Sequence, residues 1–302
     1  MATPTSSHEL ISPASLTAAA TDGDLEIAPC VAGQEDEALK FLATRPIHTV
    51  VMRGFIRDNG LVSAANRGTF YACRDRQQEG ALVGLALVGH LTMIEAHAEP
   101  ALTALARYAQ HCPNARVLMG EQEKIAKFFS HYAEAGQAPR LICRELLFEQ
   151  CGPIALSDPV LGLREATFAD LPLIIPVHAQ LAFEDSGVNP LETDPVGFRR
   201  RCARRIEQGR VWVWVEQERL MFKADVVSDT PEVIYLEGVY VRPENRGQGY
   251  ALRCLSQLGL NLLTRTRSIC LLVNEHNHAA QSLYRKARYE LRSCYDTIFL
   301  QS

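Results

Sequence analysis

Apolar positions along this chain follow two periods, and their succession predicts strands and helices in a repeated order. Alternating or continuous apolar residues predict strands, whereas apolar residues spaced three or four apart predict helices. In the first half the predicted strands are 68–74, a pair within 82–96, 115–119 and 140–148, and the predicted helices are 35–43, 47–57, 100–111 and 121–135. In the second half the predicted strands are 211–216, 219–228, 233–241, 268–274 and 289–299, and the predicted helices are 167–183, 249–265 and 277–287.

Each half ends with the order strand, helix, strand, helix, strand. This repetition predicts an internal duplication and an α/β fold with two domains in tandem, each a mixed central sheet flanked by helices. We expect the domains to cover residues 25–150 and 161–302, with a turn-rich linker at 151–160. Residues 1–24, rich in Ser, Thr, Ala and Pro, are expected to form a flexible N-terminal segment.

The composition is typical of a soluble enzyme and excludes several other classes. The chain has 302 residues, of which 47% are hydrophobic, enough to build two cores. A formal charge of −4 argues against nucleic acid or an anionic membrane as a partner, and the arginines between 199 and 205 are interpreted as a solvated helix face. The nine cysteines form no C-x-x-C pair, and no run is long enough to span a membrane, so we expect a cytoplasmic protein without a metal site.

The most informative stretch is Arg246-Gly247-Gln248-Gly249-Tyr250-Ala251, between a predicted strand and a predicted helix. Two glycines allow a tight turn in which successive N–H groups converge on an anion, and the helix dipole adds about half a positive charge there. The stretch therefore predicts a phosphate-binding turn. No Gly-Lys-Ser/Thr follows, and position 252 is Leu where a dinucleotide fingerprint has Gly, so neither nucleotide motif is present.

The remaining pattern, Arg/Gln-x-x-Gly-x-Gly/Ala, resembles the pyrophosphate-binding turn of the GCN5-related N-acetyltransferase (GNAT) superfamily. The preceding 236–243 and the following 268–274 and 277–284 resemble the fourth strand, fifth strand and next helix of that family, so that the resemblance covers about 161–300. It implies acetyl-CoA as cosubstrate and a primary amine, on a small molecule or a peptide, as acceptor. The implied fold is two acetyltransferase-like domains in tandem.

The first half has a different turn at the corresponding place. His97-Ala-Glu-Pro100 contains no glycine, carries an acid and includes a proline without an N–H group. Such a turn should repel pyrophosphate, so we expect one competent cofactor site, in the second half, and a degenerate first half.

Glu237 is the first catalytic candidate. The strand around it has two largely apolar faces, with Val233, Tyr235, Val239 and Val241 on one and Ile234, Leu236 and Tyr240 on the other. A carboxylate there should be buried, and either an Arg neutralises it or its pKa is raised. The resemblance implies that this acid takes the proton of the amine, often through water; a structural ion pair is the alternative.

Tyr284 is the second catalytic candidate. Its spacing from Ala280, Leu283 and Ala287 describes an amphipathic helix packed on a sheet, which by itself favours a core role. The family pattern Asn-x-x-Ala-x-x-x-x-Tyr, filled here by Asn277, Ala280 and Tyr284, implies instead a general acid for the departing thiolate.

Several further residues are expected to contact the cofactor. Asn277 is predicted to cap the following helix, and Asn274 to end its strand; both also lie where a ligand would bind. The resemblance implies that the backbone of Val239 and Val241 pairs with the pantetheine arm in a wedge between the fourth and fifth strands. Gly238 is a candidate for a bulge that opens this wedge.

Other side chains favour structural roles. His276 and His278 lack a third ligand at metal spacing and are expected on the surface at a helix start, and Cys254 is expected in the core. The resemblance implies that the segment 182–194 sets the choice of acceptor; its four acids suit a cationic amine or form a solvated loop. A non-catalytic acyl-CoA sensor and a scaffold in which the first half binds a partner remain alternatives, and the sequence carries no signal of oligomeric state.

Overall fold

A computed structural model describes residues 19–152, 156 and 158–301. Its centre is one mixed sheet in the order β1-β2-β3-β4-β5-β6-β13-β7-β12-β11-β10-β9-β8. The strands are β1 Ala20–Asp22, β2 Leu25–Pro29, β3 Thr69–Asp75, β4 Ala81–Val88, β5 Leu91–Ala96, β6 Val117–Glu121, β7 Pro139–Gln150, β8 Leu163–Glu165, β9 Val211–Glu216, β10 Arg219–Asp229, β11 Val233–Val241, β12 Ser268–Asn274 and β13 Glu290–Leu300.

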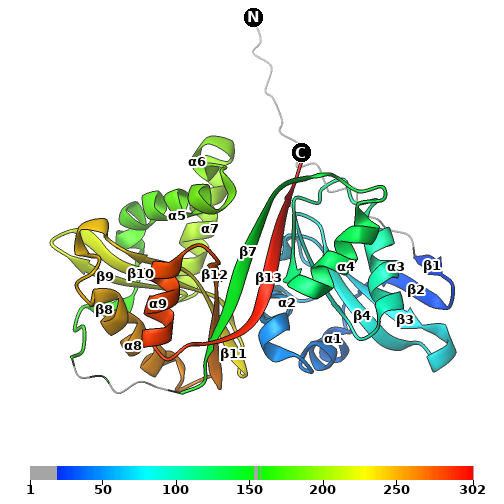
Figure 1. The fold of residues 1–302 in the computed structure, drawn as a ribbon, viewed down its shortest axis with the longest axis horizontal. Helices are drawn as coiled ribbons and strands as arrows, with labels where there is room; N and C mark the ends of the chain where they lie inside the picture. The colour runs from blue at the N-terminus through cyan, green and yellow to red at the C-terminus, as the bar shows by residue number, and fades with distance from the viewer. Residues whose placement is uncertain (1–18, 153–155, 157, 302) are drawn as a thin grey trace, which may run out of the picture.

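The two halves exchange their last strands at the centre of this sheet. β7, the last strand of the first half, lies between β12 and β13, whereas β13, the last strand of the second half, lies between β6 and β7. Figure 1 shows these two long strands crossing the middle of the molecule between a blue and cyan lobe and a yellow and orange lobe. Because every backbone group in an interior strand needs a partner, each half completes its sheet with a strand from the other.

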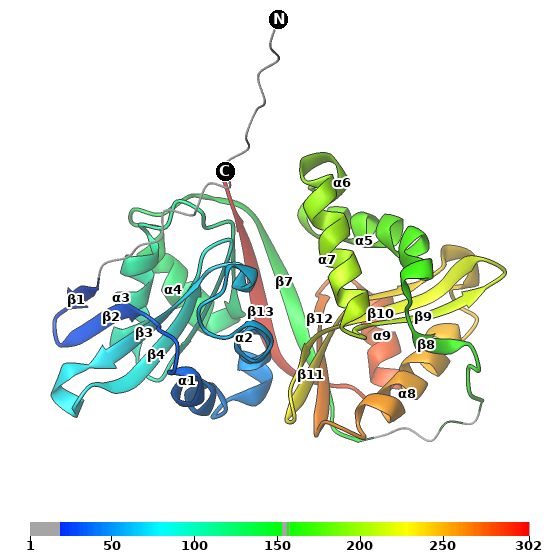
Figure 2. The ribbon, with the colours of Figure 1, turned by 180° about the vertical axis from the view of Figure 1, so that it is seen from behind.

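Helices cover both faces of the sheet. They are α1 Glu35–Leu42, α2 Pro46–Asn59, α3 Glu99–Ala109, α4 Gln122–Tyr132, α5 Leu171–Ser186, α6 Pro190–Thr193, α7 Pro195–Glu207, α8 Tyr250–Leu262 and α9 His278–Lys286. α3 and α4 pack on one face in the first half, and α8 and α9 pack on the same face in the second half. α1, α2, α5 and α7 lie on the opposite face, as the view from behind in Figure 2 shows.

α2 belongs to the first half but also covers strands of the second. The core beneath it includes Leu147, Val233 and Tyr235 together with residues of β3 to β5. Arg53 of α2, only 2% exposed, forms a 2.5 Å ion pair with Glu232 just before β11. The two halves therefore share one core across the exchanged strands.

Most predicted elements are present, with the boundaries shifted by a few residues, and the predicted α/β class is confirmed. The short strands β1, β2 and β8 and the helix α6 were not predicted. Ala20–Asp22, inside the segment expected to be flexible, pair with β2, whereas residues 1–18 lie outside the described residues. None of the described helices is long and apolar enough to cross a membrane.

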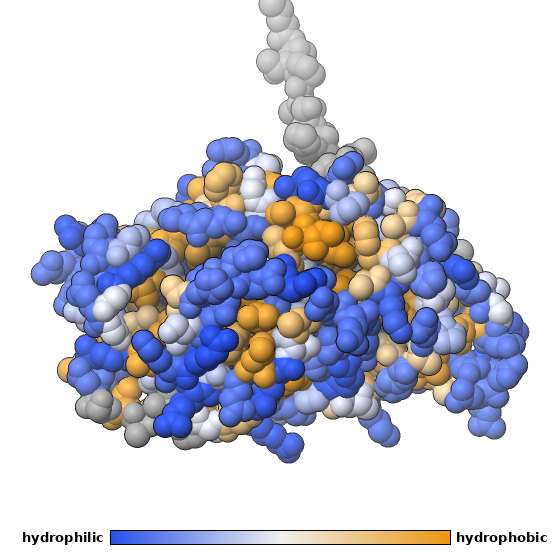
Figure 3. All heavy atoms as spheres, viewed as in Figure 1, coloured by the Kyte–Doolittle hydropathy of each residue, from blue (hydrophilic) through white to orange (hydrophobic). Residues whose placement is uncertain are grey.

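The surface is mainly hydrophilic on the face that Figure 3 shows, with a group of apolar residues near its upper centre, between the two lobes. Exposed apolar side chains include Ile142 of β7 and Phe183 of α5. Arg140 of β7 donates a 2.8 Å hydrogen bond to the carbonyl oxygen of Ser186 at the end of α5. β7 and the end of α5 are therefore neighbours.

Candidate functional site

The turn after β11 has the backbone that the sequence predicts for an anion site. Gly247 and Gly249 adopt φ values of +76° and +83°, a region that favours glycine. A Cβ atom at either position would meet nothing within 4 Å, so the requirement for glycine is conformational and the space above the turn is open. Arg246 and Gln248 are exposed beside it.

The amides of this turn have no protein acceptor. In the described part of the chain no hydrogen bond runs from the backbone N–H groups of residues 247–252, and no side chain caps the start of α8. Six successive donors at the positive end of a 13-residue helix form a cradle suited to a phosphate group. The side chain of Arg246 donates through Nε to the carbonyl oxygen of Val241 at 3.1 Å, which holds its guanidinium near the turn.

A wedge opens between β11 and β12 beside this cradle. The parallel pairing of the two strands runs from Val233 with Ser268 to Leu236 with Leu271 and then ends, although both strands continue. The backbone of Val239 and Val241 therefore has no partner on the β12 side. An extended ligand arm would find free N–H and C=O groups there, as an added strand does.

The bulge expected at Gly238 is present and changes the faces of β11. Gly238 has φ of +59°, and the register against β10 shifts between Glu237 and Tyr240. Val239 consequently packs with the cluster under α8, whereas Tyr235 packs under α2. The prediction that Val239 shares a face with Tyr235 was wrong, because it assumed strict alternation through the bulge.

Glu237 is solvent-exposed, which corrects the expectation that its carboxylate is buried between apolar faces. It precedes the bulge, on the same face as Tyr235, and follows the last residue paired with β12. Its carboxylate therefore lies at the mouth of the wedge, on the face that carries α5.

Two further acids lie on this face: Glu145, which the sequence analysis missed, and Asp185, one of the four acids in the segment 182–194. Burial raises the pKa of Glu145 in β7 to about 7; a hydrogen bond from Thr297 opposes this shift, and the charge of Glu237 adds to it. Desolvation by the surrounding protein, with the charge of Glu237, raises the pKa of Asp185 in α5 to about 6, although part of that side chain stays exposed. The face of the wedge that carries α5 is therefore acidic, and one of its acids comes from the first half.

Tyr284 lies in α9 on the opposite side of the sheet. It is 6% exposed and packs against Phe148 and Tyr289 with ring centroids 6.2 and 5.8 Å away. Its hydroxyl group has no hydrogen-bond partner among the described residues. Burial raises the pKa of Tyr284, so the hydroxyl keeps its proton at neutral pH and is available as a donor.

Asn274 and Asn277 both make the local hydrogen bonds that their positions predict. The side chain of Asn277 accepts from the N–H of Ala280 at 3.0 Å, which confirms the predicted helix cap. The side chain of Asn274 accepts from the N–H of His276 at 2.9 Å and ends β12. These bonds fix the turn between β12 and α9; contacts of either side chain with a cofactor stay a prediction.

Three residues with predicted structural roles are where the sequence placed them. His276 and His278 are exposed around the start of α9. Cys254 is fully buried in the core under α8, and burial raises the pKa of its thiol to about 12.

A buried charge cluster lies behind the bulge and was not anticipated. Lys223 in β10, with no exposed surface, donates through Nζ to Asp225 at 2.6 Å and to the carbonyl oxygen of Gly238 at 3.3 Å. His178 of α5 also contacts Asp225, and Arg205 of α7 lies 3.6 Å from it. Burial opposes ionisation of Asp225, but Lys223 and His178 hold its pKa well below the usual range. This cluster connects the bulge to α5 and α7.

The corresponding turn in the first half is closed to phosphate. α3 begins at Glu99 with Pro100 as its second residue, and Glu99 pairs with Lys127 at 2.8 Å. The turn thus lacks glycine and presents a carboxylate, as the sequence predicts.

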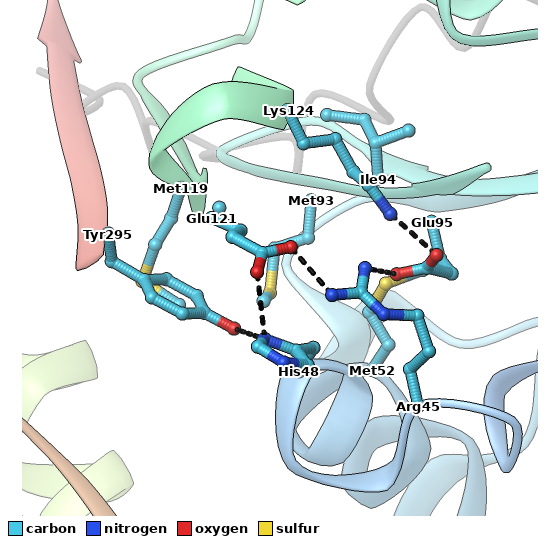
Figure 4. Close-up of a pocket in the computed structure, with 11 residues that line it drawn as sticks. Arg45, His48, Met52, Met93, Ile94, Glu95, Met119, Glu121, Lys124 and Tyr295 are labelled. Carbon is cyan, nitrogen blue, oxygen red and sulfur yellow. Dashed lines mark hydrogen bonds and ion pairs between the residues drawn. The ribbon is translucent and has the colours of Figure 1, made fainter. Parts of the chain in front are cut away.

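Side chains also fill the wedge of the first half, between β5 and β6. Arg45 contacts Glu95 at 3.4 Å and Glu121 at 2.7 Å, and Lys124 contacts Glu95 at 2.6 Å. Figure 4 shows these ion pairs around a pocket with about 10 Å³ of free interior, room for about one water molecule. Arg45 and Lys124 neutralise Glu95 near the end of β5, so this pocket is lined by ion pairs rather than by free N–H groups like those of the phosphate cradle.

Comparisons with known proteins match the segment around the turn after β11 and, separately, the whole fold. The family described as FR47-like protein matches residues 228–297, from the end of β10 into β13. No curated protein matches the chain at a significant level. Solved structures match almost its whole length at low identity.

Three of these structures illustrate the likeness. A GNAT-family acetyltransferase from Colwellia psychrerythraea is 14% identical with a TM-score of 0.57, and 91% of this chain and 99% of that one are covered. A GCN5-related N-acetyltransferase from Sphaerobacter thermophilus is 13% identical with a TM-score of 0.61, covering 92% and 96%. A tandem GNAT protein from the clavulanic acid biosynthesis pathway is 14% identical with a TM-score of 0.59, covering 92% and 99%.

The chain has the fold of the GNAT superfamily. The resemblance inferred from the turn after β11 is therefore confirmed, and the matched family segment contains that turn, Glu237 and Tyr284. The tandem GNAT protein is matched over nearly all of both chains, which agrees with the predicted duplication.

Proposed function

We propose that this GNAT protein is an N-acetyltransferase that moves an acetyl group from acetyl-CoA to a primary amine by direct attack in a ternary complex. The observation that carries the proposal is the row of N–H groups at 247–252, which find no acceptor among the described residues, next to an open wedge in the sheet. A diphosphate is the chemical group that such a cradle suits, and a thioester arm can follow the wedge to the opposite face.

In this proposal the second half holds the cosubstrate mainly through its backbone. The amides of residues 247–252, with the charge of Arg246, bind the diphosphate. The free backbone groups of Val239 and Val241 pair with the pantetheine arm. The bulge at Gly238 turns an N–H group toward the thioester oxygen, where it stabilises the charge that develops on attack.

The reaction requires a neutral amine and a proton for the thiolate. Glu237, at the mouth of the wedge, takes the proton that the nitrogen loses as the C–N bond forms, directly or through water. Tyr284, which stays protonated because it is buried, gives its proton to the sulfur as the C–S bond breaks. The acidic acceptor side favours a cationic amine, on a small molecule or a peptide.

The experiment is an assay of CoA release from acetyl-CoA with a panel of polyamines, amino acids, aminoglycosides and peptide N-termini. Tyr284→Phe should lower kcat by about 10²-fold or more, the usual contribution of a general acid, and should leave CoA affinity unchanged. The matched control is Tyr289→Phe, because that neighbouring hydroxyl is also buried without a hydrogen-bond partner in the described part of the chain, yet it plays no part in the proposed chemistry. We expect the control to keep wild-type kcat.

The same assay separates the enzyme from the alternative, a non-catalytic acyl-CoA sensor. Tight binding of acetyl-CoA by calorimetry without turnover on any amine would favour the sensor. Turnover that depends on the Tyr284 hydroxyl supports the enzyme.

A further inference from the structure

The strand exchange gives the second half a carboxylate from the first half. In β7, Glu145 stands opposite Asn274 of β12 and Tyr295 of β13. Directly paired residues of antiparallel strands point to the same face, and Tyr235 and Glu237 of β11 are on that face as well. Glu145 and Glu237 thus lie on either side of β12, near the open end of the wedge.

The contacts of Glu145 leave its charge uncompensated. Thr297 of β13 donates a hydrogen bond of 2.6 Å to its carboxylate, and the side chain is partly buried. Among the described residues no Lys, Arg or His forms an ion pair with it. Glu149, on the same face of β7 four residues later, instead pairs with Arg292 at 2.9 Å. β7 therefore carries two acids on this face. Glu149, away from the wedge, is neutralised by Arg292, whereas Glu145, beside the wedge, has no cationic partner among the described residues.

We propose that Glu145 is a further catalytic residue, the group that accepts the first proton of the acceptor, when the bound ammonium becomes a neutral amine. The inference rests on the proposed function. The acceptor enters as R–NH₃⁺ and gives this proton to Glu145, so that its lone pair attacks the thioester carbon. The C–N bond forms, the C–S bond breaks, the sulfur takes a proton from Tyr284, and Glu237 takes the second proton of the nitrogen.

The cycle closes without any other reactant. The proton on Glu237 returns through water to Tyr284, and the proton on Glu145 passes to solvent. One proton is released for each amide formed, as the overall reaction of an ammonium ion with a thioester requires.

The groups around Glu145 suit this task. Those that face it are Glu237 and Tyr235 of β11, Asp185 of α5, Thr297 and Tyr295 of β13 and Cys143 of β7. None of them carries a positive charge, and burial with the charges of Glu237 and Asp185 raises the pKa of Glu145 to about 7. A base whose pKa is near the working pH is partly deprotonated, and its pKa is closer to that of an amine than the pKa of an ordinary carboxylate is.

The test is the pH dependence of kcat/KM on an amine that the full-length wild type acetylates. We expect kcat/KM of the wild type to fall on the acid side with an apparent pKa near 7. Glu145→Gln should lower kcat/KM at pH 7.5 by about 10²-fold and remove that limb, with CoA affinity by calorimetry unchanged. The matched control Glu149→Gln should retain both the rate and the limb.

A second variant separates catalysis from packing. Thr297→Val keeps the shape of the side chain but removes the hydrogen bond that lowers the pKa of Glu145, so the acid limb should move to higher pH. If the wild type is active and Glu145→Gln retains its limb or loses less than threefold in kcat/KM, the inference is overturned while the proposed function stands. If the wild type acetylates no amine, the proposed function itself fails.

Discussion

Replacing Ala251 by proline tests the phosphate cradle with the least disturbance of the fold. Ala251 is the second residue of α8, and its N–H has no acceptor in the described structure. The first half provides the precedent, because Pro100 is the second residue of α3, at the corresponding turn. Proline is tolerated in the first turn of a helix, so the substitution should remove one donor without unfolding α8.

The expected magnitude follows from the hydrogen bond that is lost. A hydrogen bond to a charged group contributes about 1.5–3 kcal/mol, which corresponds to CoA binding weaker by about 10- to 150-fold. The pyrrolidine ring also occupies the space that the phosphate oxygen approaches, so the larger loss is expected. Stability should change by less than about 1 kcal/mol, because the deleted N–H makes no bond within the protein.

Calorimetry of CoA binding, with thermal unfolding alongside, measures both quantities. The matched control is Asp36→Pro, at the exposed second position of α1 in the first half, where the N–H group is likewise without an acceptor in the described structure. That variant should bind CoA as the wild type does. Unchanged CoA affinity in a folded Ala251→Pro protein would refute the cradle.

Three other predictions concern the stability of the protein around the site. Gly238→Ala places a Cβ 2.9 Å from both Lys223 Nζ and Asp225 Oδ2 at a φ of +59°, so urea unfolding should show a loss of about 1–3 kcal/mol; an unchanged midpoint contradicts the strained bulge. Glu232→Ala leaves the buried guanidinium of Arg53 without its partner and should lower the free energy of unfolding by about 3–5 kcal/mol, more than Arg53→Met does. A larger loss for Arg53→Met would argue against an unpaired buried charge as the cause. Because the pKa of Glu145 is raised on folding, wild-type stability should fall as the pH rises from about 4.5 to about 7. Glu145→Gln should show a smaller fall in thermal unfolding, because the raised pKa of Asp185 remains; parallel profiles contradict the shift.

The sequence predicted those features that depend on local patterns. Two glycines in a short turn, at 247 and 249, indicate positive φ angles, and Asn277 before an amphipathic run indicates a helix cap. Both predictions were confirmed. Tyr284 is buried in a helix packed on the sheet, as its spacing suggested. Its part in catalysis stays a prediction, since no local pattern fixes what the hydroxyl contacts in a complex.

The features that the sequence did not predict depend on neighbours distant in the chain. Local periodicity predicts the length of β7 and β13 but not the strands with which they pair, so the sequence did not predict the exchange of these two strands. Glu145 was overlooked for the same reason, because an acid in an alternating strand is usually solvated on an outer face. Glu237 was placed in the core because its neighbours in the strand are apolar, whereas it follows the last residue paired with β12 and is exposed there.

The exchange of β7 and β13 also constrains how this protein is made. On the ribosome, β6 emerges long before β13, its eventual neighbour, so the first lobe presents an unsatisfied sheet edge until synthesis is complete. Nascent chains should therefore depend on chaperones that shield this edge. If the chain is cut in the linker, the two fragments should stay associated, and after separation each should fold only when mixed with the other.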